Sequence, residues 1–546
     1  MNNNLRLVLD TNVFLVSLIH LLAVLPLLLP AQPLTTNLPI VRIETDGREI
    51  PDEPKITAQV FITDNGPGQM NRLDDPPNIY AGFAGIERRG ASSLWYPQPS
   101  YAIETREENG DELDISPFGW PKESDWTLIT HFNDRALMRN LLSFHFFREM
   151  GHYAPRARLV EAVLNGDYRG IYLFCERIKR DKGRVDVAKL DEDEITGPEL
   201  TGGYIIKVDY FSPQDSWQGA FEAAGRPVHY VYYYPKPEDI RPEQKSYIQA
   251  FMYNFESALY SQGFADPQTG YRKYIDVTSF IDYLIVQELS RNVDGFKKSS
   301  YFWKAKDSDG GLLHAGPVWD FDWAWKNINE CFFGATDGSG FSYRVNDCGP
   351  DIPAPGWLPR MLQDTFFANR LRCRYDSLRE GLLSEAQIFG FIDSVAQSVE
   401  TAQVRHFDRW DILGVNTGAP EVPPIPATYA GEIEKLKTWI RLRLKWLDAY
   451  LPGQCGPAPP PDPSASPLRV WPNPAAGDEI YVQGRNTAQT HYALYDATGR
   501  NVRPLTPFPD SSGRIDVSGL PAGVYLLRVS WPDGAHGLNT VRFVVR

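Results

Sequence analysis

A proline-rich segment near the C-terminus constrains the architecture of this chain more than any other feature. Residues 452–466 read PGQCGPAPPPDPSAS. Proline has a fixed φ and no amide hydrogen to donate, so this segment fits an extended linker and not a core element. The chain of 546 residues is therefore predicted to fold as at least two domains, one on each side of the linker.

Residues 467–546, after the linker, show the pattern of a small β domain. Short runs alternate apolar with polar residues and are separated by turn sequences such as TGR, SGLPAG and PDGAHG. The predicted strands lie in the runs IYVQG, THYALYDATGR, RIDVSGL, GVYLLRVSW and TVRFVV. The pattern predicts an all-β, immunoglobulin-like sandwich.

Residues 38–451, before the linker, show a mixed pattern. Strand-like runs surround one helical segment, at 134–151, in the part from 38 to about 210, and amphipathic helices dominate from about 240 to 451. We therefore expect an α+β fold, with a site between the strand-rich and helix-rich parts.

The N-terminal residues 1–31 resemble a secretory signal peptide. A single basic residue, Arg6, precedes a long apolar run that ends near Ala31. The alternative is a membrane anchor, because residues 13–29 are almost long enough to span a bilayer. We favour cleavage, and expect no membrane span in the mature chain.

Charge and cysteine content narrow the possible partners and the compartment. The formal net charge of −14, without a long basic block, argues against a nucleic-acid partner. The five cysteines fit no zinc motif. In an exported protein, Cys331 and Cys348 are placed to close a glycine-rich loop as a disulfide, whereas Cys175 lies in an apolar strand-like run and is expected to be a buried thiol.

Two acidic segments are the strongest indication of chemistry. Asp320 and Asp322 lie within the aromatic run VWDFDWAW, and Asn292 and Asp294 follow a predicted helix. If the strand-like runs YFWK and GLLHAGPV form a hairpin, Asp294 and Asp320 meet near its open end. Carboxylate and amide oxygens there suit Mg²⁺ or Ca²⁺. The alternative is structural: Asp294 caps a turn, and Asp320 pairs with a cationic side chain.

Several motifs, in order, resemble the CotH family of atypical secreted kinases, which was first named for spore-coat proteins. They are LPIVRIETDGREIPDEPKI, ERRGASS, NDRALMRN, LNGDYRGIYLFCERIKRD, the N-x-D of Asn292–Asp294 and WDFD at 319–322. The resemblance implies a divergent protein-kinase-like fold and transfer of phosphate from ATP with Mg²⁺ or Mn²⁺. It implies Asp294 as the catalytic acid/base, Asp320 as a metal ligand and Asp322 as a second ligand; the residues themselves add the Asn292 carboxamide as a candidate ligand.

Four further residues are candidates for contact with the nucleotide. Lys207 alternates with apolar neighbours on a predicted strand, and Glu176 and Lys179 lie in the charged run ERIKRD, where a Lys–Glu pair is able to place a phosphate. Arg89 begins the RG-x-SS motif. The alternatives are a solvated charged loop at 176–180 and a lysine at 207 that extends to the surface.

The sequence also departs from the family pattern. Many members carry lysines in a P-K-K-S-Y run, where this chain has Gln98 and Pro99. Some members have an asparagine after the catalytic aspartate, where this chain has Ser299 and Ser300. If the missing lysine contacts phosphates, that contact is lost.

The C-terminal module resembles the sorting domain of type IX secretion, which exports proteins across the outer membrane of Bacteroidetes-type bacteria. The resemblance rests on VWPNPA, LYDATGR, IDVSGLPAGVYLLRV and the final VRFVVR. It implies a secreted or cell-surface protein that reaches its destination by a Sec signal peptide and the type IX machinery. The alternative is a carbohydrate-binding or fibronectin-like sandwich.

Three functions follow from these features. The first is a secreted CotH-type kinase that transfers the γ-phosphate of ATP to a hydroxyl of an extracytoplasmic protein. The second is an inactive surface binding or adhesion protein with the same fold, which the changes at 98–99 and the scarcity of extracellular ATP favour. The third is a calcium-dependent surface protein that uses the same aspartates for structure.

Overall fold

The computed structural model describes residues 34–456, 469–471, 473–475, 477–483, 491–496, 500–508, 513–530 and 539–545. The predicted signal peptide and most of the predicted linker lie outside these residues. The chain divides into two compact units, Met1–Gln454 and Cys455–Arg546. Each is described by itself, and the domain boundaries inferred from the sequence stay predictions.

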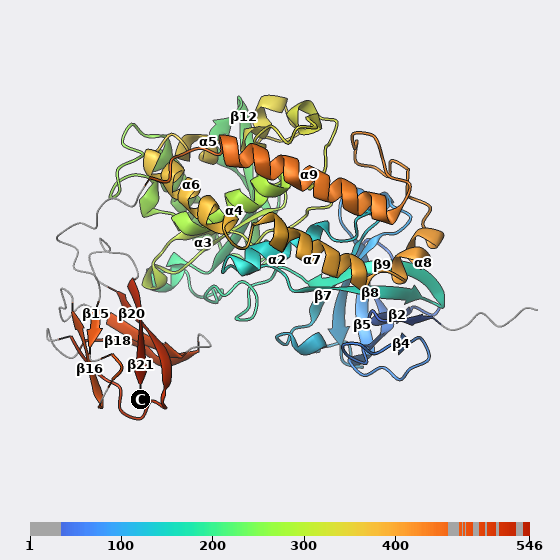
Figure 1. Cartoon of the computed structure of the whole chain (residues 1–546), viewed down its shortest axis with the longest axis horizontal. Coiled ribbons are helices and arrows are strands. Elements are labelled where there is room, and N and C mark those ends of the chain that lie inside the picture. Colours follow the sequence, from blue (N-terminus) through green and yellow to red (C-terminus); the bar gives the residue numbers. More distant parts are fainter. Residues whose placement is uncertain are drawn as a thin grey trace, which may run out of the picture. The chain divides into compact units, whose positions relative to one another are not determined.

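A closed barrel of seven strands forms the N-terminal part of the first unit (Figure 1). Neighbouring strands are antiparallel except for the parallel closure of β2 on β8. In spatial order the strands are β2 (Ile40–Glu44), β3 (Ile56–Thr63), β5 (Tyr80–Arg89), β6 (Ser100–Arg106), β7 (Asp125–Thr130), β9 (Asp167–Glu176) and β8 (Ala157–Leu164). A small ribbon pairs β1 (Thr35–Thr36) with β4 (Asn71–Arg72).

The hairpin between β8 and β9 follows from local chemistry. Asn165 and Gly166 both have positive φ, at 49° and 78°, which is the conformation of a two-residue hairpin turn. The Asn165 side chain also links to Thr45, which follows β2. The sequence signal for this turn is therefore confirmed.

A second sheet of five antiparallel strands follows the barrel. Its spatial order is β11 (Ser216–Ala223), β12 (Arg226–Tyr234), β10 (Tyr204–Val208), β13 (Ser300–Lys304) and β14 (Leu313–Ala315). Strands β13 and β14 are far along the chain from the other three, so the central pairing of β10 with β13 joins the strand-rich and helix-rich parts.

Helices surround this sheet. They are α2 (Arg139–Glu149), α3 (Pro242–Tyr260), α4 (Val277–Ser290), α5 (Trp357–Met361), α6 (Thr365–Arg379), α7 (Glu385–Ser398), α8 (Ala402–Arg409) and α9 (Tyr429–Tyr450). Side-chain caps begin four of them, because Asp276, Asp364, Ser384 and Thr428 accept hydrogen bonds from first-turn amides. Figure 1 shows the long helix α9 beginning on the side of α8 and running past the other helices toward α5.

Short 3₁₀ helices lie in the connections. They are η1 (Ser92–Trp95), η2 (Pro117–Gly119), η3 (Gly197–Thr201), η4 (Tyr271–Lys273), η5 (Asp307–Asp309), η6 (Cys331–Gly334) and η7 (Ser342–Cys348). A disulfide joins Cys331 to Cys348, as the sequence predicted. Cys175 is a buried free thiol, also as predicted, and burial raises its pKa to about 12, so it stays protonated and unreactive.

Apolar cores stabilise the first unit, and two of those formed by the described residues are large. One fills the barrel and includes Trp126, Tyr172 and Phe174. The other is larger and packs the helices against the second sheet. Helix α4 lies at its centre, since every residue from Ser279 to Ser290 is buried. Burial of this order is the main source of stability for such a domain.

The C-terminal unit consists of strands, as the alternating pattern predicted. One sheet contains β15 (Arg469–Trp471), β16 (Glu479–Gln483) and β19 (Arg514–Asp516); the other has the order β18 (Asn501–Pro507), β17 (His491–Asp496), β20 (Gly523–Ser530) and β21 (Asn539–Val545). Both sheets contribute to one apolar core. The immunoglobulin-like arrangement of these strands stays a prediction.

The mixed composition of strands and helices agrees with the expected α+β class. The protein-kinase-like character of the first unit is not decided by these elements and stays a prediction. Across the described ranges, no helix has both the length and the apolar character needed to span a membrane.

Candidate active site

The predicted hairpin brings the two acidic segments together. Strands β13 and β14 pair antiparallel, with Phe302 opposite Ala315 and Lys304 opposite Leu313. The chain enters β13 just after Asp294 and leaves β14 just before Asp320. The open end of the hairpin therefore carries both aspartates, as the sequence predicted.

Asp294 lies in a tight loop that follows α4. Arg291 ends the helix in the left-handed conformation, at φ +45°, and the Asn292 side chain accepts a hydrogen bond from the amide of Asp294 at 3.2 Å. A Cβ atom on Gly295 would lie 2.1 Å from Oε1 of Gln287, so a larger residue here would require the Gln287 side chain to move.

Two lysines partly neutralise Asp294. Lys297 donates to Oδ1 of Asp294, and Lys298 Nζ lies 3.7 Å from the same oxygen. Both lysines also pair with Asp351, at 3.2 and 2.6 Å. Within the described part of the chain, Oδ2 of Asp294 accepts no hydrogen bond, so this oxygen is open to a substrate hydroxyl.

The aromatic residues around Asp320 anchor its loop. The Phe321 amide donates to Oδ1 of Asn140 at 2.8 Å, and the Trp325 indole donates to Ser143 at 2.9 Å. Both acceptors belong to α2. The Trp319 ring stacks on Phe144 of the same helix with centroids 5.7 Å apart. The aromatic residues of 319–325 therefore anchor the segment that carries Asp320 and Asp322 to α2.

Asp320 lies among other acids and has an unusual backbone conformation. Its φ of +69° is tolerated by aspartate better than by most residues. Desolvation and the neighbouring carboxylates of Asp322 and Asp294 raise the pKa of Asp320 to about 8. Its carboxylate accepts a hydrogen bond from Ser299 at 3.3 Å, and the Asn292 amide donates to its backbone oxygen at 3.2 Å.

Asp320 nevertheless reaches solvent, because its residue surface is exposed. Among the described residues it forms no ion pair. A solvent-accessible carboxylate that lacks a cationic partner and is crowded by other acids is a favourable place for a cation. The structural alternative, in which Asp320 pairs with an arginine or lysine, finds no support in this part of the chain.

Asp322 lies deeper than Asp320. It accepts a hydrogen bond from the Asn133 amide at 3.3 Å. Desolvation raises the pKa of Asp322, although Lys326 and Asn133 oppose the rise. Lys326 is itself buried, and its ammonium donates to the Asn133 carbonyl at 3.0 Å.

The segment Asn133–Asn140 supports the whole acidic loop, a role that the sequence analysis did not assign. Asn133 contacts Asp322 and Asn140 contacts Phe321, while Arg135 forms buried ion pairs with Glu421 and Glu432. The sequence signal for this role was the presence of several polar residues next to the apolar helix that follows them. Polar groups that are buried need hydrogen-bond partners, so such residues are candidates for structural contacts.

The oxygen donors fit a divalent cation that is completed by a ligand. Across the described residues, no three side chains of histidine, cysteine, aspartate or glutamate form a ready-made metal cluster. Mg²⁺ commonly uses only one or two carboxylates and takes its remaining ligands from water and phosphate. Asp320 with Asp322 or Asn292 satisfies that requirement.

Two of the predicted nucleotide-contacting residues lie near this site. The guanidinium of Arg89, at the end of β5, lies 5.2 Å from the ring centroid of Trp319, the residue before Asp320. Lys207 on β10 pairs with Asp209 at 2.8 Å, and Asp209 contributes to the raised pKa of Asp320. Arg89 and Lys207 therefore lie on different sheets, the barrel and the second sheet.

The predicted pairing of Lys179 with Glu176 is wrong. Lys179 pairs with Glu123 and Asp125, at 2.8 and 2.9 Å. Glu176 is fully buried and binds Arg156 at 2.8 Å. Each side chain found a partner on a neighbouring segment, which a pattern of charges along one strand cannot reveal.

Gln98, which replaces a family lysine, is a structural residue here. Its side-chain amide donates to the carbonyls of Arg169 and Ile171, at 3.1 and 3.0 Å, and accepts from Thr130 at 2.9 Å. It is completely buried. Of the two serines after the Asp294 loop, Ser299 donates to Asp320, whereas Ser300 donates to backbone carbonyls.

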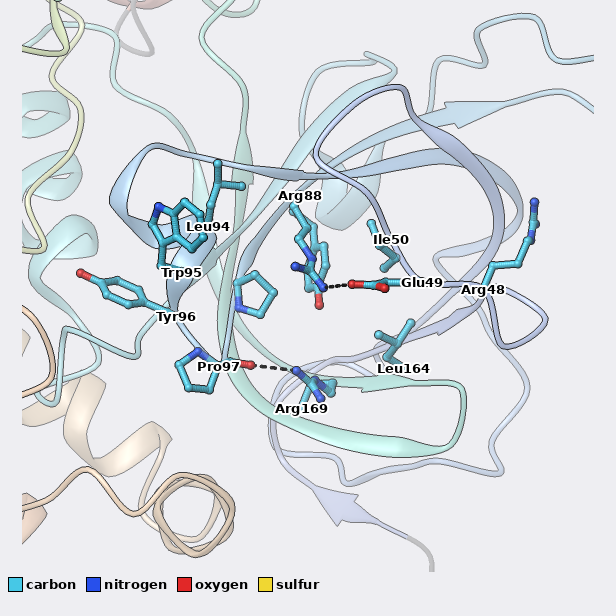
Figure 2. Close-up of a pocket in the computed structure, with 12 residues that line it drawn as sticks. Arg48, Glu49, Ile50, Arg88, Leu94, Trp95, Tyr96, Pro97, Leu164 and Arg169 are labelled. Atoms are coloured by element: carbon cyan, nitrogen blue, oxygen red, sulfur yellow. Dashed lines mark hydrogen bonds and ion pairs between the residues drawn. The ribbon is translucent and has the colours of Figure 1, made fainter.

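A cavity of about 440 Å³ at the barrel is separate from the acidic site. Figure 2 shows its lining, where Arg88 pairs with Glu49 at 2.9 Å and Arg169 donates to the Pro97 carbonyl at 3.0 Å. Neither Asp294 nor Asp320 belongs to this lining. Because the acidic segments lie elsewhere, we do not place the nucleotide here.

Comparison with known proteins places the first unit in a family. The family described as "CotH kinase protein" matches residues 86–447. That range covers well over half of the chain, and the chain belongs to this family. It includes Arg89, both acidic segments and all of the second sheet.

One curated relative is inner spore coat protein H of Bacillus subtilis (strain 168). It is 25% identical over 198 residues, which are 36% of this chain and 49% of that protein. The chain therefore matches about half the length of this relative.

The C-terminal unit also matches a known family. The family described as "Secretion system C-terminal sorting domain" covers residues 469–538. This domain indicates a secreted or cell-surface protein that interacts with a secretion machinery. The prediction of a type IX sorting module at this end of the chain is confirmed.

Proposed function

We propose that this protein is an exported kinase that transfers the γ-phosphate of ATP to a hydroxyl of an extracytoplasmic protein. The observation that carries the proposal is the β13–β14 hairpin, whose open end carries Asp294 and the solvent-exposed Asp320. An exposed carboxylate that lies among other acids and forms no ion pair within the described residues favours a bound cation, and membership of the CotH kinase family supplies the reaction class.

Each residue has a chemical role in this proposal. Asp294 orients the acceptor hydroxyl through its open Oδ2 and takes its proton as the new oxygen–phosphorus bond forms. The bond between the γ-phosphorus and the bridging oxygen breaks, and ADP leaves with the electron pair. Lys297 and Lys298 hold the Asp294 carboxylate in place by contacting its other oxygen.

Asp320, with Asp322 or Asn292, would hold Mg²⁺ or Mn²⁺. When bound, the ion would neutralise the charge of the phosphates. Arg89 and Lys207 are proposed to contact the nucleotide from either side of the acids. Export by a Sec signal peptide and type IX secretion, in a Bacteroidetes-type bacterium, belongs to the same proposal.

Incubation of the protein with γ-labelled ATP, a divalent salt and a bacterial envelope extract tests the proposal directly. We expect labelled protein from the parent and from Asp309→Asn, a matched change at an exposed aspartate. Asp294→Asn and Asp320→Asn should each abolish labelling while the protein stays folded. Equal labelling by either variant and the parent would refute the assigned roles.

One observation favours a second function, that of an inactive surface binding protein. Gln98 is buried and bonded to backbone carbonyls, so it offers nothing to a phosphate. Thermal melts separate the candidates, because a ligand that binds the folded state raises the midpoint. Stabilisation by ATP with Mg²⁺ supports the kinase, stabilisation by Ca²⁺ alone supports a calcium-dependent surface protein, and no change supports the binding protein.

A further inference from the structure

A groove of about 780 Å³ lies among α7, α8 and the N-terminal half of α9. These three helices are neighbours in Figure 1. The floor of the groove is apolar and includes Ala396, Val404, Phe407, Leu413 and Ile433. Val404, on α8, has 51% of its surface exposed. The groove therefore presents apolar surface that a partner is able to cover.

The rim of the groove is acidic. It contains Asp393, Glu400, Asp408 and Glu434, and its one cationic side chain, Lys437, is already paired with Asp393. Within the described residues, Glu400, Asp408 and Glu434 form no ion pair. The rim thus offers three carboxylates to a partner.

The basic residues of α8 face away from the groove. Arg405 pairs with Glu161 at 2.7 Å, and Arg409 pairs with Asp167 at 3.0 Å. Both acids belong to the barrel. These arginines fasten α8 to the barrel and leave the acidic rim without a cation from the helix itself.

The walls of the groove are held in place before any partner binds. The buried His406 ring accepts a hydrogen bond from the Ile171 amide at 3.0 Å, which fixes α8 on β9. Glu432, near the start of α9, is buried and paired with Arg135. A preformed groove loses little conformational entropy on binding.

We propose that this groove docks a basic amphipathic segment of another protein, with its apolar side chains on Val404 and its cationic side chains on the rim. Such helix-in-groove recognition needs an apolar floor and complementary charge. The proposal does not depend on phosphate transfer.

Two other occupants fit less well. The parts of this chain outside the described residues carry three arginines and no lysine, namely Arg6, Arg485 and Arg546, so they offer no basic segment. A second copy of the chain brings a formal charge of −14 against an acidic rim, which repels it.

A synthetic peptide tests the proposal on the full chain. The probe is a fluorescent peptide of about 14 residues with leucine at positions i, i+3, i+4 and i+7 and lysine on its other face. Fluorescence anisotropy should show saturable binding that weakens with added salt. A peptide of the same composition in scrambled order should bind at least tenfold more weakly.

Matched variants locate the binding surface. Glu400→Gln with Asp408→Asn and Glu434→Gln should weaken binding about tenfold or more, because three rim charges are lost. The control triple, Glu238→Gln with Asp309→Asn and Glu380→Gln, removes the same charge from exposed acids elsewhere and should leave binding unchanged.

The apolar floor is tested in the same way. Val404→Asn should weaken binding severalfold, whereas Val415→Asn, at another exposed valine, should not. Equal effects of the two triples, or equal binding of the ordered and scrambled peptides, would overturn the proposal, since only overall charge would then matter. A dimer in sedimentation that Val404→Asn dissolves would also overturn it, in favour of a second copy as the occupant.

Discussion

The charge on Asp320 gives the most informative single prediction. The substitution Asp320→Asn keeps the size of the side chain and removes its ability to ionise. In the folded protein the pKa of Asp320 is raised from 3.8 to about 8. Between those two values the folded state binds more protons than the unfolded state, so the free energy of unfolding falls as pH rises through this window. Asparagine does not titrate and escapes that loss.

The magnitude follows from the same shift. At about 1.4 kcal/mol for each tenfold change in proton affinity, the upper bound is about 6 kcal/mol. Because Asp320 is exposed, solvent screening reduces the usable figure to about 1–2 kcal/mol. For a unit of this size the gain corresponds to about 1–2 °C in the melting midpoint, by the per-residue entropy of unfolding.

Thermal melts without divalent ions are the assay. We expect Asp320→Asn to melt above the parent at about pH 8.5 and close to it at about pH 4. Adding MgCl₂ with ATP at the higher pH should raise the midpoint of the parent and not that of the variant. Asp309→Asn serves as the control and should follow the parent throughout.

The opposite results would refute the reasoning. A variant that melts below the parent at high pH would mean that the Asp320 carboxylate is stabilised and not crowded. Equal stabilisation of both proteins by Mg²⁺ with ATP would mean that Asp320 does not hold the ion.

Three further predictions concern stability. Gln98→Lys introduces the lysine that resembles the family pattern and should lower the free energy of unfolding by about 3 kcal/mol or more, because it buries an unpaired charge. Chemical denaturation should show a smaller loss of stability for the uncharged control, Gln98→Met. Replacing both Cys331 and Cys348 by serine opens a loop with a sequence separation of 17 and should lower the free energy of unfolding by about 3 kcal/mol. The reduced parent, which lacks the same cross-link, is the control and should be as unstable as this variant. Asn140→Ala should lower the free energy of unfolding by about 1–3 kcal/mol, because it leaves the Phe321 amide without its acceptor. Asn140→Asp keeps an acceptor oxygen and should lose less stability in calorimetry. Equal losses of stability in the two variants would contradict the role of Asn140.

Local pattern was enough to predict much of the fold. The alternation of residues 467–546 predicted strands, and the Asn165–Gly166 turn predicted the β8–β9 hairpin, because both depend on neighbouring residues alone. Helix α4 and the β13–β14 hairpin were also predicted, because the spacing of apolar residues along the chain indicates these elements. The hairpin in turn predicted that Asp294 and Asp320 lie at one end of it.

Ion-pair and hydrogen-bond partners on distant segments could not be predicted from the sequence. Lys179, which follows β9, pairs with Glu123 and Asp125 and not with Glu176. These two acids lie just before and at the start of β7, which is the neighbour of β9 in the barrel. Gln98 became a buried anchor for the same reason.

The sequence by itself determined which residues carry charge, which parts of the chain are rich in strands or in helices, and that two acidic segments flank one hairpin; the helix predicted at 134–151 is shorter in the structure, Arg139–Glu149. Only the tertiary structure decided that Asn133 and Asn140 support the acidic loop, that Asp320 lacks a cationic partner among the described residues, and that three helices leave an acidic groove. The physical reason is that secondary structure follows from the spacing of neighbouring side chains, whereas ion pairing and burial depend on which distant segments pack together.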